Sequence, residues 1–358
     1  MNNLHHPNPK RKPTTQKHPK TTENTSNHRR VENRRKHPTN PHQPTPPHNP
    51  HHQKTTTTSV SHHDPELAPP TVAITISTID LNQAAFLVIH NGQAIMRRTA
   101  IDPRTVAFPA SVRPYINDHG LFDSSSSPEA RVYYSAKDAG YFIKTAAANT
   151  LRHEAELTAY FHGKGLSAPV LRYCTDESGH DWMVTPRIPG EDCVTSRYLH
   201  EPARLAVLLA HRLWALHELD FTGCPDRNRL RDYLATAARN HAAGHWDVSF
   251  YTELYGEASV DGIYAVACGN RSLLRADTLV HGDYCLPNVI LNDWRFSGFV
   301  DMDCAGVSDR HVDVFWALWT LRFNLHTDAY REVFLDAYGR DLVDEDLLRT
   351  IAAIEVFG

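Results

Sequence analysis

The chain of 358 residues lacks several features that mark common protein classes. It has six cysteines, but none forms a Cys-x-x-Cys pair or has the spacing of a zinc site, which argues against structural zinc and fits a reducing compartment. No apolar run reaches membrane-spanning length, and no signal peptide follows Met1. We therefore expect a cytoplasmic protein that does not act at a membrane, and no obligate protein partner is evident.

The first 63 residues have almost no large apolar side chains and only two acids, Glu23 and Glu32. They contain eleven His and eleven Lys or Arg residues. Such a segment cannot bury enough surface to offset its loss of conformational entropy, so residues 1–70 are predicted to be a disordered tail. A solvated extension, a His-rich metal-binding segment and an untranslated segment are all compatible with it. The segment would be untranslated if the true start of the protein lay at or near Met96, which is the only methionine between Met1 and Lys144.

The rest of the chain is acidic. Of 37 basic and 41 acidic residues, 26 and 39 lie after residue 63, a formal balance of −13. An acidic body favours a small cationic substrate over nucleic acid, although many proteins are acidic for solubility alone. Residues 71–105 hold two β-prone runs, at 72–79 and 84–89, and are predicted to be a short extension before the main fold.

A spaced set of polar residues follows the short β-prone run 278–280. Asp283 lies on the loop after that run, Asn288 follows five positions later and Asp301 eighteen positions later. An Asp that takes a hydroxyl proton, with an amide and a carboxylate that hold Mg²⁺, is the minimum set for phosphoryl transfer from ATP. The set indicates a kinase that uses ATP and Mg²⁺. The alternative is that these are ordinary carboxylates of surface loops.

The residues between Asn288 and Asp301 suggest how these two side chains meet. Residues 289–291 and 297–300 have the pattern of two strands, joined by a turn at 292–293. A hairpin of this length returns Asp301 to the side of Asn288. Two oxygen ligands, completed by water and phosphate oxygens, suit Mg²⁺.

A second polar pair is predicted upstream. Residues 130–135 and 140–145 have the pattern of a β-hairpin, and a cation at Lys144 on its second strand needs a partner if it is buried. Glu154 shares the apolar face of a predicted helix over 151–162. A Lys on a strand paired with a Glu on the next helix is how kinases position ATP phosphates. The alternative is an ordinary surface pair.

The loop before this hairpin is rich in serine. Small residues such as Ser126 and Ser127 would let backbone N–H groups approach phosphates. The same composition is also typical of a loop that is only flexible, and the sequence does not choose between the two.

The C-terminal half is predicted to be mostly helical. A strand over 181–187 leads to a hinge closed by Pro189-Gly190, and helices follow over 203–220, 309–324 and 344–356. Their aromatic residues, Trp214, Phe315 and Trp316 among them, are expected in the core rather than in contact with a ligand. Asp313 either braces the loop of Asp283 or lies at the surface.

Several motifs together resemble the aminoglycoside phosphotransferase family. They are His281-Gly-Asp283 with Cys285-Leu-Pro-Asn288, Ser297-Gly-Phe-Val-Asp301, Gly306-Val-Ser-Asp309-Arg310, Cys224-Pro225, Arg229-Leu230 and Ile354-Glu355-Val356-Phe357. From about Pro109 to Phe357 the chain is most similar to the 3′-phosphotransferases that inactivate kanamycin- and neomycin-type antibiotics. The resemblance implies an α+β, two-lobed protein-kinase-like fold. A small β-rich lobe would span 106–190 and a larger, mostly helical lobe 191–358, with ATP between them.

The resemblance also implies roles by motif position. Asp283 would be the catalytic base, Asn288 and Asp301 the Mg²⁺ ligands, and Lys144 with Glu154 the clamp on the phosphates.

Two further sets of residues come from the same resemblance. Adenine would meet the hinge backbone from Pro186 to Ile188, where Pro186 lacks an N–H but keeps its carbonyl. Asp247 and Glu355 occupy places where the family binds substrate amines. Alternatively, Asp247 and Glu355 are ordinary exposed charges, one on a loop and one near the chain terminus.

Two positions depart from the family's pattern. Asp303-Cys304 stands where Gly-Arg is usual, and Trp319 stands where an Arg is common, although Arg322 lies one turn along. The missing guanidinium removes an expected anion contact, which leaves the range of antibiotics open. Three functions follow: an aminoglycoside kinase that confers resistance, a kinase for another small alcohol such as a choline- or homoserine-like metabolite, and a non-catalytic nucleotide-binding relative. Protein kinase activity is less expected, because no activation segment follows Asp301.

Overall fold

The computed structural model describes residues 89–90, 93–94, 98–124, 126 and 129–358. These residues all belong to one compact unit, Thr75–Gly358. The predicted tail over 1–70 and the predicted run over 72–79 lie outside the described residues, as does Ser127. Their predictions therefore stay predictions.

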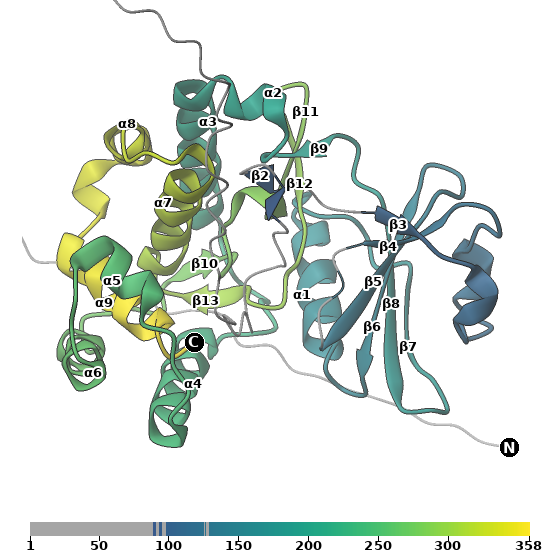
Figure 1. Ribbon diagram of the computed structural model, residues 1–358, viewed down its shortest axis with the longest axis horizontal. Helices are drawn as coiled ribbons and strands as arrows, with labels where there is room; N and C mark the ends of the chain where they lie inside the picture. The colour runs from purple at the N-terminus through teal and green to yellow at the C-terminus, as the bar shows by residue number, and fades with distance from the viewer. Residues whose placement is uncertain (1–88, 91–92, 95–97, 125, 127–128) are drawn as a thin grey trace, which may run out of the picture. The chain divides into compact units, whose positions relative to one another are not determined.

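A six-stranded antiparallel sheet forms the N-terminal part of the fold (Figure 1). Its order is β3-β4-β5-β6-β8-β7. The strands are β3 (Arg98–Ala100), β4 (Leu121–Ser124), β5 (Ala130–Ser135), β6 (Tyr141–Ala147), β7 (Arg172–Thr175) and β8 (His180–Pro186). Aromatic and branched side chains on one face form a core of their own, with Tyr133, Ile143 and Trp182 at its centre. The three strands predicted here are confirmed, with ends displaced by at most two residues.

Strand β3 lies at the edge of the sheet. Its residues Arg98–Ala100 fall in the segment predicted as a short extension over 71–105, and they pair in register with Phe122–Ser124 of β4. The short pair β1 (Ile89–His90) and β2 (Gln93–Ala94) precedes it. The described sheet therefore includes a strand that precedes residue 106, where the predicted lobe starts.

Helix α1 (Arg152–Gly163) connects the sheet to the helical part of the molecule. On one side Ala155 packs in a small core with Ala146 and Met183 of the sheet. On another side Leu157 and Phe161 join the large core of the helical part. The predicted helix over 151–162 is confirmed within one residue. Because α1 has apolar contacts in both directions, a change in its position would be felt in both parts.

The C-terminal part is mostly helical. Its helices are α2 (Ser196–Leu199), α3 (Pro202–His217), α4 (Arg229–Ala243), α5 (Ser249–Tyr255), α6 (Val260–Gly269), α7 (His311–Leu325), α8 (Arg331–Tyr338) and α9 (Glu345–Glu355). Two small antiparallel sheets accompany them: β9 (Glu191–Asp192) with β11 (Val289–Asn292) and β12 (Arg295–Phe299), and β10 (Thr278–Val280) with β13 (Gly306–Ser308). The arrangement confirms the predicted α+β fold with a β-rich and a helical part.

Two of the three aromatic residues expected in the core are buried. Phe315 and Trp316 on α7 are 3% and 8% exposed, whereas Trp214 on α3 is 45% exposed. The prediction for Trp214 was wrong, because α3 buries the side formed by Leu205, Leu209, Leu213 and Leu216. Trp214 follows Leu213 by one residue, about 100° around the helix.

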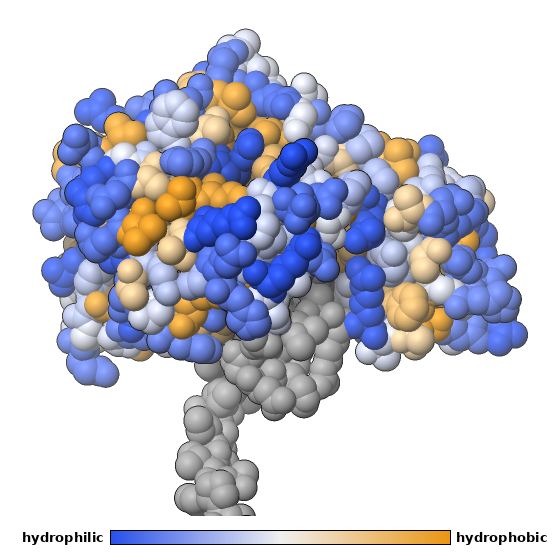
Figure 2. Space-filling view, turned by 90° about the horizontal axis from the view of Figure 1, so that it is seen from above, coloured by the Kyte–Doolittle hydropathy of each residue, from blue (hydrophilic) through white to orange (hydrophobic). Residues whose placement is uncertain are grey.

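Hydrophilic residues cover most of the face shown in Figure 2, with groups of hydrophobic residues between them. In the part of the chain that the structure describes, no helix is long and apolar enough to cross a bilayer.

Candidate active site

The loop that carries Asp283 is held by a buried carboxylate. The backbone N–H groups of His281 and Gly282 donate to the two oxygens of Asp313 at 2.8 and 2.7 Å. Asp313 lies on α7 with no exposed surface, and His217 Nε2 on α3 is 3.1 Å from its Oδ2. Asp313 therefore braces the loop and is not a surface residue. It fixes the start of the turn after β10 to the helical core.

Gly282 is required by this geometry. Its φ is +82°, and a Cβ built there would lie 1.9 Å from the Cys304 carbonyl oxygen. The neighbouring His281 is fixed as well, because its Nε2 is 3.0 Å from the Val300 carbonyl and must donate to it. Its Nδ1 then accepts the Asp283 N–H at 3.3 Å. The backbone on either side of Asp283 is thus defined by local contacts.

Asp283 and Asn288 are joined directly. The Asn288 side-chain amide donates to Asp283 Oδ2 at 2.8 Å and to the Asp283 carbonyl at 3.0 Å. Burial raises the pKa of Asp283, and hydrogen bonds from Cys285 and Asn288 oppose that rise. A carboxylate with a raised pKa is a better proton acceptor than an exposed one.

The predicted hairpin returns Asp301 to this pair. β11 and β12 pair from Val289 with Phe299 to Asn292 with Arg295, and the Val300 N–H donates to the Asn288 carbonyl at 3.1 Å. Asp301 has a φ of +62°, which a non-glycine residue adopts at some cost. The turn lies at Asp293–Trp294, one residue later than predicted. The hairpin prediction is otherwise confirmed.

Lys144 links the sheet to the hairpin. Its Nζ is 2.8 Å from Glu154 Oε2 on α1 and 3.1 Å from Asp301 Oδ1. The Lys144 side chain is 20% exposed and that of Glu154 only 4%. Burial lowers the pKa of Lys144, but the carboxylates of Asp301 and Glu154 raise it above its ordinary value. Lys144 therefore carries its charge, and its contacts bring together three predicted residues, which come from β6, from α1 and from the loop after β12.

The oxygen donors suit Mg²⁺ better than a dedicated protein cage. Among the residues that the structure describes, no three His, Cys, Asp or Glu side chains cluster as a metal site. Asn288 and Asp301 would give Mg²⁺ two protein oxygens. Mg²⁺ in nucleotide sites keeps several waters and binds phosphate oxygens, so a two-ligand protein site fits it.

The expected hinge lies at the end of β8. Pro186 pairs in register with Tyr141, and the Arg187 N–H donates to the Gly140 carbonyl at 2.9 Å. Within the described residues, the N–H of the buried Ile188 has no protein partner, which leaves a donor for a ligand. Ser126 has a partner within the protein, because its hydroxyl oxygen accepts the Val132 N–H at 3.1 Å. Its predicted approach to phosphate stays a prediction.

Asp247 and Glu355 are brought to one region of the helical part. The Asp247 N–H donates to the Val356 carbonyl at 2.9 Å, so the loop before α5 lies against the C-terminal segment. Glu355 is not a free terminal charge, because it accepts hydrogen bonds from Tyr233 at 2.7 Å and Trp316 at 3.0 Å. Burial raises the pKa of Glu355 to about 7. Tyr233 and Trp316 were not foreseen as partners.

The positions without the family's arginines are filled by other contacts. Burial raises the pKa of Cys304 to about 12, so its thiol is neutral. Trp319 stacks on Phe323 at 4.9 Å between ring centroids. Arg322 lies 3.5 Å from Glu253 and from Asp328. Its guanidinium is engaged there by carboxylates.

One residue of this region was missed. His153 Nε2 lies 3.1 Å from Asp226 Oδ2, and His153 Nδ1 lies 3.7 Å from Asp303 Oδ1. The nearby carboxylates of Asp303 and Asp226 raise the pKa of His153. In the sequence, only its position next to Glu154 could have indicated that His153 lies near the site.

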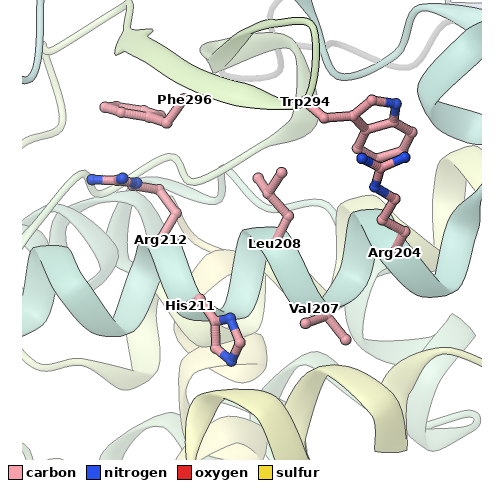
Figure 3. Close-up of a pocket in the computed structure, with 7 residues that line it drawn as sticks. All are labelled: Arg204, Val207, Leu208, His211, Arg212, Trp294 and Phe296. Atoms are coloured by element: carbon pink, nitrogen blue, oxygen red, sulfur yellow. The ribbon is translucent and has the colours of Figure 1, made fainter.

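The clearest cavities lie elsewhere. A pocket of about 390 Å³ is formed between α3 and the β11–β12 turn (Figure 3). In it Arg204 lies over the Trp294 ring at 4.1 Å and Arg212 over the Phe296 ring at 4.0 Å. A second pocket of about 270 Å³ includes Trp319. Neither is lined by a predicted site residue, since a site that closes around its ligand need not show as a cavity without it.

Comparisons with known proteins agree with this geometry. The model of the "Phosphotransferase enzyme family" matches residues 85–350. A probable aminoglycoside 3′-phosphotransferase of Lactococcus lactis subsp. lactis (strain IL1403) is 44% identical over 251 residues, which cover 70% of this chain and 95% of that protein. An aminoglycoside 3′-phosphotransferase of Niallia circulans is 31% identical over 60% of this chain and 83% of its own length.

A solved structure gives the same result for the fold. The crystal structure of an aminoglycoside-3′-phosphotransferase of type VIII superposes with a TM-score of 0.54 at 28% identity, over 66% of this chain and 91% of that one. The predicted protein-kinase-like fold is thereby confirmed. With a family model that matches most of the chain and a relative 44% identical along nearly its whole length, this phosphotransferase belongs to the aminoglycoside phosphotransferase family.

Proposed function

We propose that this chain transfers the γ-phosphate of ATP to a hydroxyl group of an aminoglycoside antibiotic and so confers resistance to it. The observation that carries the proposal is a chain of contacts. Asn288 bonds Asp283 at 2.8 Å, Val300 next to Asp301 bonds Asn288 at 3.1 Å, and Asp301 contacts Lys144 at 3.1 Å. The relatives named as aminoglycoside 3′-phosphotransferases support the choice of substrate.

Each residue has one task in this proposal. Asp283 orients the substrate hydroxyl and accepts its proton, for which a raised pKa is an advantage. Lys144 offsets negative charge on the phosphates, and Glu154 holds its ammonium group in place. Asn288 and Asp301 would hold Mg²⁺. MgATP supplies the phosphoryl group when it is bound.

Nucleotide and substrate would be held by different elements. The free N–H of Ile188 and the carbonyl of Pro186 suit the edge of adenine, which needs one donor and one acceptor. Ser126 and Ser127 would lie near the phosphates. Asp247 and Glu355 carry negative charge for the substrate amines, which fits the acidic balance of the body of the chain.

The test is an activity panel with a matched control. Purified protein is incubated with MgATP and kanamycin, neomycin, choline or homoserine, and ADP release and product mass are measured. We expect a phosphorylated aminoglycoside. Asp283→Asn keeps the shape of the side chain but not the proton acceptor, and should reduce turnover by about 10²- to 10⁴-fold.

The other outcomes separate the alternatives. ADP release only with choline or homoserine would show that the substrate is a metabolite, and the proposed mechanism of phosphoryl transfer would still hold. Binding of MgATP without turnover of any substrate would indicate a non-catalytic relative. Asp247→Ala and Glu355→Ala should weaken aminoglycoside binding and leave nucleotide binding intact, and weakened nucleotide binding in both would contradict the proposed substrate contacts.

A further inference from the structure

His153 on α1 lies between two carboxylates of the helical part. Its Nε2 is 3.1 Å from Asp226 Oδ2 and its Nδ1 is 3.7 Å from Asp303 Oδ1. These residues are 73 and 150 positions away in the sequence. The imidazole therefore connects the first turn of α1 to two separate loops of the other part of the molecule.

The loop that carries Asp226 is held by several contacts. The Asp226 carbonyl accepts the Val307 N–H of β13 at 2.8 Å, and Asp226 Oδ1 accepts the Asn228 N–H at 2.8 Å. The Asp226 side chain is only 12% exposed, which limits its freedom. Asp303 lies two residues after Asp301. His153 thus contacts Asp226, whose loop is held in place, and Asp303, which belongs to the loop that carries the proposed Mg²⁺ ligand Asp301.

The contacts close a ring of residues around the phosphate clamp. Asp301 contacts Lys144 at 3.1 Å and Lys144 contacts Glu154 at 2.8 Å. His153 adjoins Glu154 in the chain and returns to Asp303 beside Asp301. A movement of α1 away from these two loops would break the His153 contacts and would also draw Glu154 away from Lys144. Contacts in one network of this kind are expected to be energetically coupled.

We propose that His153 is a positioning residue for the nucleotide: through Asp303 and Asp226 it holds α1 against the Asp301 loop, so that Glu154 keeps Lys144 at the phosphates. The inference rests on the proposed function for its nucleotide. It assigns a task to Asp303, which lies two residues after the proposed Mg²⁺ ligand Asp301. In this chain the loop is tied from α1 by an imidazole.

The kinetic test separates positioning from general stability. His153→Ala and Asp303→Asn should each raise KM for MgATP about tenfold and leave KM for the aminoglycoside within about twofold, because the proposed phosphate contact, Lys144 with Glu154, is separate from the proposed substrate contacts, Asp247 and Glu355. The double variant should show little further rise, since both changes break the same contact. His162→Ala is the matched control: it removes a His of the same helix whose Nδ1 bonds the nearby Ser167 carbonyl at 2.9 Å.

The inference is overturned if His153→Ala has the same KM for MgATP as His162→Ala. It is also overturned if both Michaelis constants rise together, because that result would show a loosened fold. Circular dichroism and the Tm without nucleotide establish that each variant is folded.

A binding measurement keeps this inference apart from the proposed function. The rise in Tm on adding MgATP is compared between wild type and His153→Ala, with no aminoglycoside present. A smaller rise in the variant supports the inference even if no aminoglycoside is turned over. An equal rise in both, or no rise in the wild type, contradicts it, and wild-type turnover then decides the proposed function by itself.

Discussion

The side-chain amide of Asn288 donates to the Asp283 carboxylate at 2.8 Å and to the Asp283 carbonyl at 3.0 Å. Neither acceptor carries a hydrogen, so the amide nitrogen must face Asp283 and the amide oxygen must point away from it. That oxygen is the atom that could bind Mg²⁺. One side chain therefore couples the proposed base to the proposed metal site.

Asn288→Ala should impair the use of Mg²⁺. The change removes an oxygen ligand and also frees the Asp283 carboxylate from its hydrogen bond. We expect the Mg²⁺ concentration for half-maximal activity to rise about 10- to 100-fold, measured by titrating Mg²⁺ in the ADP-release assay. Asn324→Ala is the control, because that amide bonds the Thr320 carbonyl within α7 at 2.8 Å. An unchanged Mg²⁺ requirement in Asn288→Ala would remove Asn288 from the metal site.

Gly282→Ala should destabilise the protein and abolish activity. The added Cβ would meet the Cys304 carbonyl oxygen at 1.9 Å at a φ of +82°. The left-handed conformation alone costs about 1–2 kcal/mol, and the clash adds to it. Gly163→Ala is the matched control, since nothing lies within 4 Å of its Cβ position at the end of α1. Thermal unfolding compares them, and equal Tm values would contradict the expected strain at Gly282.

Asp313→Ala should lower the free energy of unfolding. The change leaves the His281 and Gly282 N–H groups without their buried acceptor and removes one of the two partners of His217. Each buried unsatisfied group costs about 1–3 kcal/mol, so we expect a loss of about 3 kcal/mol or more in urea unfolding. Asp341→Ala changes an exposed carboxylate and should leave stability within about 0.5 kcal/mol. A loss below about 1 kcal/mol for Asp313→Ala would show that the brace is dispensable.

Aminoglycoside binding should strengthen as pH rises through about 7. Burial raises the pKa of Glu355 to about 7, so the carboxylate that would attract a substrate amine is mostly protonated at pH 6. For a single group with that pKa, KM for the aminoglycoside should fall about tenfold between pH 6 and pH 8 while the amine stays protonated. KM for MgATP is measured as the internal control. In Glu355→Gln this part of the pH dependence should disappear, and its persistence would assign it to another group.

The same shift has a consequence for stability with the opposite sign. The folded pKa of Glu355 lies above the ordinary value of 4.5, so the folded state binds more protons than the unfolded state between about pH 4.5 and 7. The contribution of Glu355 to stability is therefore present at low pH and is lost as pH rises through this window. Urea unfolding at pH 5 and 7.5 should show this decline in the wild type and a smaller one in Glu355→Gln.

Much of the site could be predicted because its residues are close in sequence. Asp283, Asn288 and Asp301 lie within one loop and one hairpin, and the strand pattern between them specifies how the ends meet. Lys144 and Glu154 lie on consecutive elements, so their pairing follows from one strand and one helix. Local patterns carry this information because hairpins and short connections leave few alternative arrangements.

Other elements could not be predicted from local pattern. α4 and α6 were not predicted; each fully buries only two residues, Leu230 with Ala237 and Ile263 with Ala267. β9 has two residues and exists because β11 offers it a partner. The exposure of Trp214 likewise depends on which side of α3 meets the core.

The sequence by itself determined which residues make up the proposed site: Asp283, Asn288 and Asp301, with Lys144 and Glu154, at spacings that short connections can close. Only the tertiary structure decided what holds them. The contact of Asp313 with the loop of Asp283, the partners of Glu355 and the bridge from His153 to Asp226 and Asp303 join residues far apart in the chain. Such contacts depend on how whole elements pack. Packing is set by the combined burial of many apolar side chains, so it cannot be read from the spacing of a few residues in the sequence.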